Sequence, residues 1–283
     1  MVSIKIDGRT LMVPEESTIL EAAQSNGIPI PHLCFLKGLN EIAACRMCMV
    51  EVEGAERLIP ACNSRVSDGM VIRTNTNRVR QARKTNLRLI LSQHDSNCTV
   101  CVRSQNCALQ KLSHDLNIHF QPYAVQPERS RVDLGAPVVR EASKCIKCMR
   151  CVQVCDKIQS MNIWDVAGTG ARTTVDVSYN RALKYTDCTY CGQCVTHCPT
   201  GALTARDDTN LALRALADPE LTTVVQVAPA VRAAWAESFG LDSETGSVGR
   251  IAAALKRIGF DYVFDTNFTA DLTIMEEGSE LLE

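Results

Sequence analysis

The chain has 283 residues, a formal net charge of −2 and 15 cysteines. Hydrophobic residues make up 46% of it and charged residues 22%, an ordinary globular composition that excludes a mainly disordered protein. The near-zero charge argues against a protein that binds nucleic acid through bulk electrostatics. The sequence has no apolar run long enough for a membrane span and no apolar signal segment at its start. We therefore expect a cytoplasmic protein whose cysteines bind metal rather than form disulfides.

Residues 1–78 predict a β-grasp domain with a metal site. Val2 to Asp7 alternates like a strand, Asp7-Gly8 is typical of a hairpin turn, and a second strand follows. Residues 14–17 would open an amphipathic helix that ends near Gly27. A β-grasp ferredoxin begins in this order, so we predict a [2Fe–2S] cluster. Its ligands would be Cys34, Cys45, Cys48 and Cys62, whose spacing differs from the plant-type pattern and leaves zinc as the alternative.

Residues 79–125 predict a second, smaller metal-binding domain. Apolar residues at helical spacing between Arg78 and Leu91 indicate a helix that leads to His94. The next cysteine group has three members, and the histidine completes a set of four: His94, Cys98, Cys101 and Cys107. One imidazole and three thiolates suit either structural zinc or a [4Fe–4S] cluster, and the other cysteine groups of the chain favour the cluster.

Residues 126–212 contain the most specific pattern, two cysteine runs with the bacterial ferredoxin spacing. They are Cys145-x2-Cys148-x2-Cys151-x3-Cys155 and Cys188-x2-Cys191-x2-Cys194-x3-Cys198, and Pro199 follows the second run only. In such runs three cysteines bind one [4Fe–4S] cluster and the fourth binds the other. We therefore assign Cys145, Cys148, Cys151 and Cys198 to one cluster, and Cys155, Cys188, Cys191 and Cys194 to the other. Zinc bound by paired cysteines is the less favoured alternative.

The segments around these runs predict further elements. Residues 161–177 read as a hairpin with its turn at Gly168-Thr169-Gly170. Residues 213–283 predict an α/β segment with strands at 223–227 and 262–265 and a helix at 248–258 that Gly259 ends. The exposed face of such a small parallel sheet should dock on another surface.

Six basic residues and no acid lie between Asp68 and Asp95. We expect them to form a solvated helix face, with compensation of cluster charge or docking of an acidic partner as the alternatives. The basic residues are Arg73, Arg78, Arg80, Arg83, Lys84 and Arg88.

The order of these sites resembles the N-terminal iron–sulfur half of [FeFe] hydrogenases and the large iron–sulfur subunit of complex I (NADH dehydrogenase). The run Val225-Gln226-Val227-Ala228-Pro229-Ala230-Val231-Arg232 is similar to the first strand of the hydrogenase catalytic domain, and 264–278 resembles a later stretch. The resemblance covers essentially the whole chain and favours the hydrogenase branch. It implies an α+β multidomain fold, in which the four domains are 1–78, 79–125, 126–212 and a partial hydrogenase-like segment, 213–283.

In that family, four further cysteines downstream of this segment bind the catalytic H-cluster. No cysteine follows Cys198, so we expect the H-cluster-binding half to be absent and, if the sequence is complete, the chain to perform no hydrogen chemistry alone. Gly168-x-Gly170 lacks the third glycine of a dinucleotide fingerprint, and there is no phosphate-binding GxxxxGK[ST] motif. We therefore expect no catalytic residue in this chain.

These observations predict an electron relay with one [2Fe–2S] and three [4Fe–4S] clusters. The resemblance implies a multi-subunit, flavin-containing NAD(P)H-linked complex of an anaerobe, coupled to ferredoxin by electron bifurcation. The expected partners are a flavin- and NAD(P)H-binding subunit, a further iron–sulfur subunit and soluble ferredoxin. The alternative is a fragment or split chain of an [FeFe] hydrogenase that carries electrons to an H-cluster held elsewhere, and a redox sensor or zinc protein is a third reading.

Overall fold

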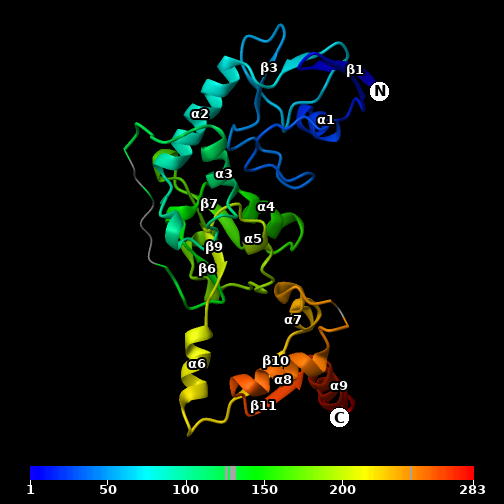
Figure 1. Ribbon diagram of the computed structural model, residues 1–283, viewed down its shortest axis with the longest axis vertical. Coiled ribbons are helices and arrows are strands. Elements are labelled where there is room, and N and C mark those ends of the chain that lie inside the picture. The colour runs from blue at the N-terminus through cyan, green and yellow to red at the C-terminus, as the bar shows by residue number, and fades with distance from the viewer. Residues whose placement is uncertain (125–126, 128–131, 243) are drawn as a thin grey trace. The chain divides into compact units, whose positions relative to one another are not determined.

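The computed structural model describes residues 1–124, 127, 132–242 and 244–283. It divides into two compact units, residues 1–206 and residues 207–283 (Figure 1). Within the described residues, no helix has the length and apolar character that crossing a membrane requires.

A five-stranded mixed sheet forms the N-terminal part of the first unit (Figure 1). Its order is β2-β1-β5-β3-β4, with β1 and β5 parallel and the other pairs antiparallel. Ile4 and Ile6 point into the core, so the predicted alternation and hairpin are confirmed. The strands are β1 (Val2–Ile6), β2 (Arg9–Val13), β3 (Met49–Val52), β4 (Ile59–Pro60) and β5 (Val71–Arg73).

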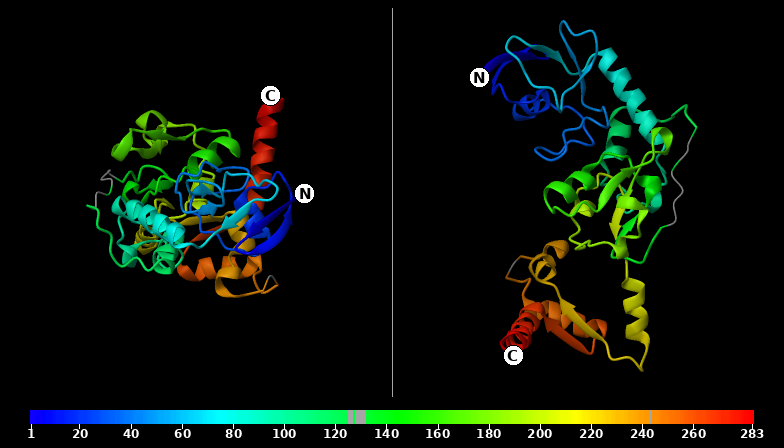
Figure 2. Two further views of the ribbon diagram at one scale, coloured as in Figure 1. Left: turned by 90° about the horizontal axis from the view of Figure 1, so that it is seen from above. Right: turned by 180° about the vertical axis from the view of Figure 1, so that it is seen from behind.

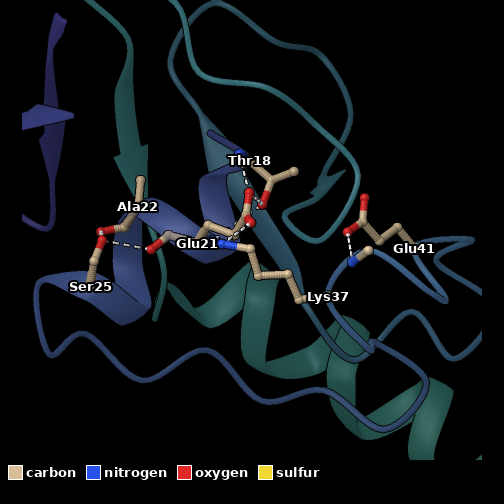
Figure 3. A network of polar contacts seen from close by, with 7 residues as sticks. Thr18, Glu21, Ala22, Ser25, Lys37 and Glu41 are labelled. Atoms are coloured by element: carbon tan, nitrogen blue, oxygen red, sulfur yellow. Dashed lines mark hydrogen bonds and ion pairs between the residues drawn. The ribbon is translucent and has the colours of Figure 1, made fainter. Parts of the chain in front are cut away.

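Helix α1 (Ile19–Ser25) packs on this sheet and begins later than the sequence predicted. Thr18, rather than the segment 14–17, caps the helix: its hydroxyl accepts from the Glu21 N–H at 3.2 Å, and the Glu21 carboxylate accepts from the Thr18 N–H at 2.9 Å (Figure 3). This reciprocal pair is a capping box. Glu21 also forms an ion pair with Lys37 at 3.0 Å. The Thr18 backbone bond is the main cause of the lowered pKa of Glu21.

Helix α2 (Asn77–Ser92) confirms the predicted helix that leads to His94, and it is followed by α3 (Ala108–Asp115). Its buried face repeats every four residues, at Val79, Arg83 and Leu87. The prediction of a solvated basic face is therefore wrong for Arg83, which is 6% exposed. The reason is its place in the apolar stripe, where its guanidinium donates to the Met49 carbonyl at 2.8 Å.

The remainder of the first unit contains two small antiparallel sheets and two short helices (Figure 2). Strands β6 (Val138–Arg140) and β9 (Leu203–Ala205) form one sheet, and β7 (Trp164–Ala167) with β8 (Thr174–Val177) form the other. The second pair confirms the hairpin predicted between the cysteine runs. Helices α4 (Arg150–Lys157) and α5 (Gln193–Thr196) contain the third cysteine of each run and pack together.

The second unit is an α/β arrangement around a parallel pair of strands, β10 (Val224–Val227) and β11 (Tyr262–Asp265). Both predicted strands and the helix that Gly259 ends are confirmed. Large apolar side chains stay exposed on this unit, Phe268 at 58% and Met275 at 68% among them. The helices are α6 (Thr209–Ala217), α7 (Pro229–Ala234), α8 (Val248–Ile258) and α9 (Thr266–Leu282).

The capping box of α1 predicts a measurable stability effect. Thr18→Ala removes the oxygen that accepts the Glu21 N–H and should lower the free energy of unfolding by about 1 kcal/mol. Anaerobic urea denaturation of the cluster-loaded chain measures this. The control is Ser25→Ala, because the Ser25 hydroxyl donates only to carbonyls of its own helix (Figure 3) and its loss should be nearly neutral. Equal effects of the two substitutions would contradict the capping role.

Candidate metal centres

All 15 cysteines lie within the described residues, and none of them forms a disulfide. Each predicted cysteine ligand therefore keeps a free thiol that could bind metal. Eight of the thiol-bearing residues are buried, Cys191 is exposed, and the others are intermediate. Groups of buried thiols are typical of metal sites in proteins from reducing compartments rather than of disulfide-stabilised proteins.

The first group forms two pairs of buried thiols. Cys34 and Cys45 share one hydrogen bond and Cys48 and Cys62 share another, which lowers the pKa of Cys45 and of Cys48 and raises that of each partner. The structure thus brings together all four residues from three loops, one after α1, one before β3 and one after β4. A [2Fe–2S] cluster has two irons and four cysteine ligands, so two pairs of thiols suit it.

A buried cation lies close to this first group. Burial lowers the pKa of Arg83 to about 10, while the charges of Cys48 and Asp7 act in the opposite direction. The Nε atom of Arg83 is buried, and no described residue forms a hydrogen bond with it. A guanidinium in this position can compensate thiolate charge, which is the alternative that the sequence left open.

The two ferredoxin-type runs surround two separate cavities. One cavity is lined by Cys145, Cys148, Cys151 and Cys198. The other is lined by Cys155, Cys188, Cys191 and Cys194. In each case, three cysteines come from one run and the fourth comes from the end of the other run. The two lining sets coincide with the two crossed ligand sets that the spacing predicts.

The two runs share an unusual backbone that explains how three thiols face one cavity. Lys147 and Met149 have φ values of 55° and 63°, and Tyr190 and Gly192, at the equivalent positions, have 53° and 74°. Left-handed residues are costly unless they are glycine, by roughly 1–2 kcal/mol each. They turn the chain around the cavity so that backbone N–H groups face sulfur. The Lys147 N–H lies 3.4 Å from the Cys145 Sγ atom, and that of Tyr190 bonds to Cys188.

Trp164 lies between these two cavities and lines both of them. Burial raises the pKa of Cys194 to about 11. A hydrogen bond between the Trp164 side chain and Cys194 partly offsets this rise. Trp164 is 4% exposed, as a core residue would be. The cysteine spacing carries no signal for this contact between the tryptophan and sulfur.

The second group is assembled less completely. His94, Cys98 and Cys107 line one cavity, whereas the Cys101 Sγ atom lies against Gly201, 2.9 Å from where a Cβ on that glycine would be. The His94 Nδ1 atom is buried and has no hydrogen-bond partner among the residues that the structure describes. Burial is the main cause that lowers the pKa of His94, which favours the neutral imidazole that metals bind. An unpartnered ring nitrogen beside thiols fits a metal centre.

Within the described residues, no three His, Cys, Asp or Glu side chains converge on one point as ligands of a single metal ion do. The thiols of the ferredoxin-type runs instead line the walls of cavities. Cavities of this kind can accommodate a cluster in which each thiolate binds a separate iron.

The second group also contacts the end of the second ferredoxin-type run. The Arg103 guanidinium donates to the carbonyls of Val195 and Cys198, each at 3.3 Å. The Cys107 thiol lies 3.9 Å from the Pro199 carbonyl. Through these contacts, the segment that carries the second group packs directly against the end of the second run.

Four family models match successive parts of the chain. They are a 2Fe-2S iron-sulfur cluster binding domain (residues 1–77), the NADH-ubiquinone oxidoreductase-G iron-sulfur binding region (83–122), a 4Fe-4S dicluster domain (144–202) and the C-terminal domain of the iron only hydrogenase large subunit (221–283). The chain therefore carries one 2Fe-2S domain and 4Fe-4S domains.

Known proteins are similar to the chain over most or all of its length. The NADP-reducing hydrogenase subunit HndD of Solidesulfovibrio fructosivorans is 46% identical over all of this chain, which spans 49% of that relative. The NADPH-Fe(3+) oxidoreductase subunit alpha of Geobacter sulfurreducens is 37% identical over 73% of the chain, which is 24% of that protein. The chain thus spans half or less of these relatives. It resembles the iron–sulfur part of hydrogenases and of complex I, as the order of its sites implied.

One solved structure supports the fold. A chain in the crystal structure of an NAD+-reducing [NiFe]-hydrogenase superposes with a TM-score of 0.68 and 23% identity, and the match covers 72% of this chain and 87% of that one. At this identity the likeness concerns the arrangement of helices and strands.

The crossed cavities make a prediction about paired variants. Cys155→Ser and Cys191→Ser should damage the same [4Fe–4S] cluster and give the same change in the electron paramagnetic resonance (EPR) spectrum of the reduced chain. Cys198→Ser and Cys148→Ser should share a different change. Each pair is the control for the other. A Cys155→Ser spectrum that matches Cys148→Ser instead would contradict the crossed assignment.

The second group makes a separate prediction. His94→Ala should remove a metal ligand and lower the iron content of the reconstituted chain by roughly four atoms. His119→Ala is the matched control, because His119 lines the same cavity from an exposed position. Iron and sulfide analysis measures both. Full iron content in the His94 variant, or the same loss in the control, would contradict the assignment of His94.

Proposed function

We propose that this chain binds one [2Fe–2S] cluster and three [4Fe–4S] clusters and relays electrons between partner proteins. The [2Fe–2S] ligands would be Cys34, Cys45, Cys48 and Cys62. The [4Fe–4S] ligands would be, in order along the chain, His94, Cys98, Cys101 and Cys107; Cys145, Cys148, Cys151 and Cys198; and Cys155, Cys188, Cys191 and Cys194.

One observation carries this proposal most directly. Two neighbouring cavities are each lined by four cysteines, three from one run and one from the other. Such crossing is expected where the two runs of a ferredoxin share a pair of clusters. The unpartnered Nδ1 atom of His94 supports the second site, and the buried thiol pairs of the first group support the [2Fe–2S] site.

The chain's own residues would set the properties of the relay. Iron–sulfur clusters, when bound, accept and donate single electrons, and hydrogen bonds to sulfur, net charge and exposure set their potentials. The Lys147 N–H group at Cys145, the Trp164 side chain at Cys194 and the Arg83 guanidinium near Cys48 supply donors and charge. Cys191 is exposed, so its site would reach the protein surface on one side.

We infer that the relay works in a multi-subunit complex that contains flavin and uses NAD(P)H. A hydride donor gives two electrons together, so a flavin must separate them before single-electron carriers can accept them. A flavin- and NAD(P)H-binding subunit, a further iron–sulfur subunit and soluble ferredoxin are the partners of this scheme. Coupling by electron bifurcation in an anaerobe belongs to the same proposal. The names of the relatives, an NADP-reducing hydrogenase subunit and an NADPH-Fe(3+) oxidoreductase subunit, support it.

A second candidate has a specific observation in its favour. Residues 221–283 match the C-terminal domain of the iron only hydrogenase large subunit, and the similarity to HndD extends over the whole chain. The chain would then carry electrons within an [FeFe] hydrogenase, to an H-cluster held by other residues.

Purification of the native protein from its host without oxygen separates the two candidates. The relay predicts that the chain purifies together with a flavin subunit and without an H-cluster. Intact mass, flavin absorbance and infrared bands of iron-bound CO and cyanide are the measurements. A longer chain, or a tightly bound partner, that shows those infrared bands would contradict the relay and establish the hydrogenase.

A further inference from the structure

Asn40 occupies an unusual position between two of the proposed sites. It is 0% exposed and lies in the loop that follows Cys34. Its Nδ2 atom donates to the Cys34 carbonyl at 2.8 Å and to the Cys148 carbonyl, also at 2.8 Å. Cys34 is a proposed [2Fe–2S] ligand, and Cys148 is a proposed ligand of a [4Fe–4S] cluster. One side chain therefore joins the backbones of two ligand residues that are distant in sequence.

The chemistry of this contact restricts the residue type. Two N–H donors on a single nitrogen are needed, one for each carbonyl, and an amide supplies them. Aspartate offers no donor, leucine offers none, and serine offers only one. Glutamine keeps the amide but places it one methylene further from the backbone. Asn40 is thus the side chain that fits both carbonyls.

The loop holds this side chain in a fixed place. The Asn40 N–H donates to the Leu36 carbonyl at 2.8 Å, and the Leu36 N–H donates to the Asn40 carbonyl at 3.0 Å. These reciprocal bonds close a tight turn with Gly38 at a φ of 71°. The amide is therefore presented by a constrained backbone rather than by a loose loop.

Neighbouring hydrogen bonds join the same two segments of the chain. Arg150 donates to the carbonyls of Cys34 and Phe35 at 3.3 and 3.0 Å, and Lys157 donates to the Leu39 carbonyl at 2.6 Å. The side chains of Cys34 and Cys148 belong to one buried apolar cluster. Among the described residues, the buried Asn40 Oδ1 atom has no hydrogen-bond partner. The fit of this side chain to its site therefore lies in its two donor contacts.

We propose that Asn40 is a positioning residue for electron transfer between the [2Fe–2S] site and the adjacent [4Fe–4S] site. It fixes the separation of the two ligand loops. Its amide also links the Cys34 and Cys148 carbonyls through two hydrogen bonds. The step concerned moves one electron, so one site is oxidised as the other is reduced, with no bond broken and no proton moved. This inference rests on the proposed function, because it requires both clusters.

The test uses the full chain loaded with iron and sulfide under anaerobic conditions. Asn40→Leu keeps a similar volume and removes both donors. The matched control is Asn86→Leu, because the Asn86 amide also donates to a backbone carbonyl, that of Arg46, beside the proposed ligand Cys45, at 2.9 Å, without crossing to another site. Iron content and the EPR spectrum of each reduced cluster establish that both sites are loaded.

Electron exchange between the two sites is then followed by rapid freeze-quench EPR after partial reduction. The expected result is a severalfold slower exchange and a weaker magnetic interaction between the two reduced clusters in Asn40→Leu, with Asn86→Leu like wild type. Wild-type exchange and interaction in Asn40→Leu would overturn the role of Asn40 alone. An absence of exchange in the wild-type chain would overturn the proposed relay itself.

A second variant covers the case in which Asn40→Leu fails to load a cluster. Asn40→Gln keeps an amide that is too long to reach both carbonyls at their present distances. Slower exchange in this variant with both clusters present supports the proposal, and exchange at the wild-type rate overturns it.

Discussion

The structure depends on one constraint, the burial of thiols in groups that face common cavities. Burial raises the pKa of Cys148 to about 12 and that of Cys151 well above its usual value. The thiolate is the form that binds metal, so these cysteines need a nearby positive centre to release their protons. On the proposed ligand assignment, metal binding and folding of this region would be coupled, as in other small metal-bound domains. The short helices α4 and α5 and the small sheets around them have the shape that such a constraint imposes.

The same constraint explains the backbone of the cysteine runs. Wrapping three thiols around one cavity requires two left-handed residues in each run. Gly192 adopts that conformation without strain, whereas Lys147, Met149 and Tyr190 do not. The strain persists because both runs pack against the shared core that contains Trp164. The N–H groups that the turns expose then bond to sulfur. A local cost in backbone energy thus brings donors to the sulfur atoms of the proposed ligands.

Much of this arrangement could be predicted from sequence because spacing along the chain is itself geometric information. The ferredoxin spacing led to the two crossed sets that line the two cavities, and alternation and helical periodicity led to β1, α2, the β7–β8 hairpin and both strands of the second unit. One miss involves a local helix cap, and the others involve contacts between distant segments. The start of α1 depends on the bond between Thr18 and Glu21, the burial of Arg83 depends on the Met49 carbonyl, and the bridge of Asn40 spans 108 positions. No periodic pattern encodes such pairings, although the T-x-x-E sequence at 18–21 is a capping-box pattern that could have been found.

Four separate iron–sulfur sites imply a definite iron content, which Mössbauer spectroscopy of the chain reconstituted with ⁵⁷Fe measures most directly. One two-iron and three four-iron clusters would give roughly 14 irons per chain, about one seventh of them in [2Fe–2S] form. The Cys62→Ser variant should lose that [2Fe–2S] component and keep the [4Fe–4S] spectrum. A chain that takes up zinc in preference to iron, or whose iron lies entirely in one cluster type, would contradict four separate iron–sulfur sites.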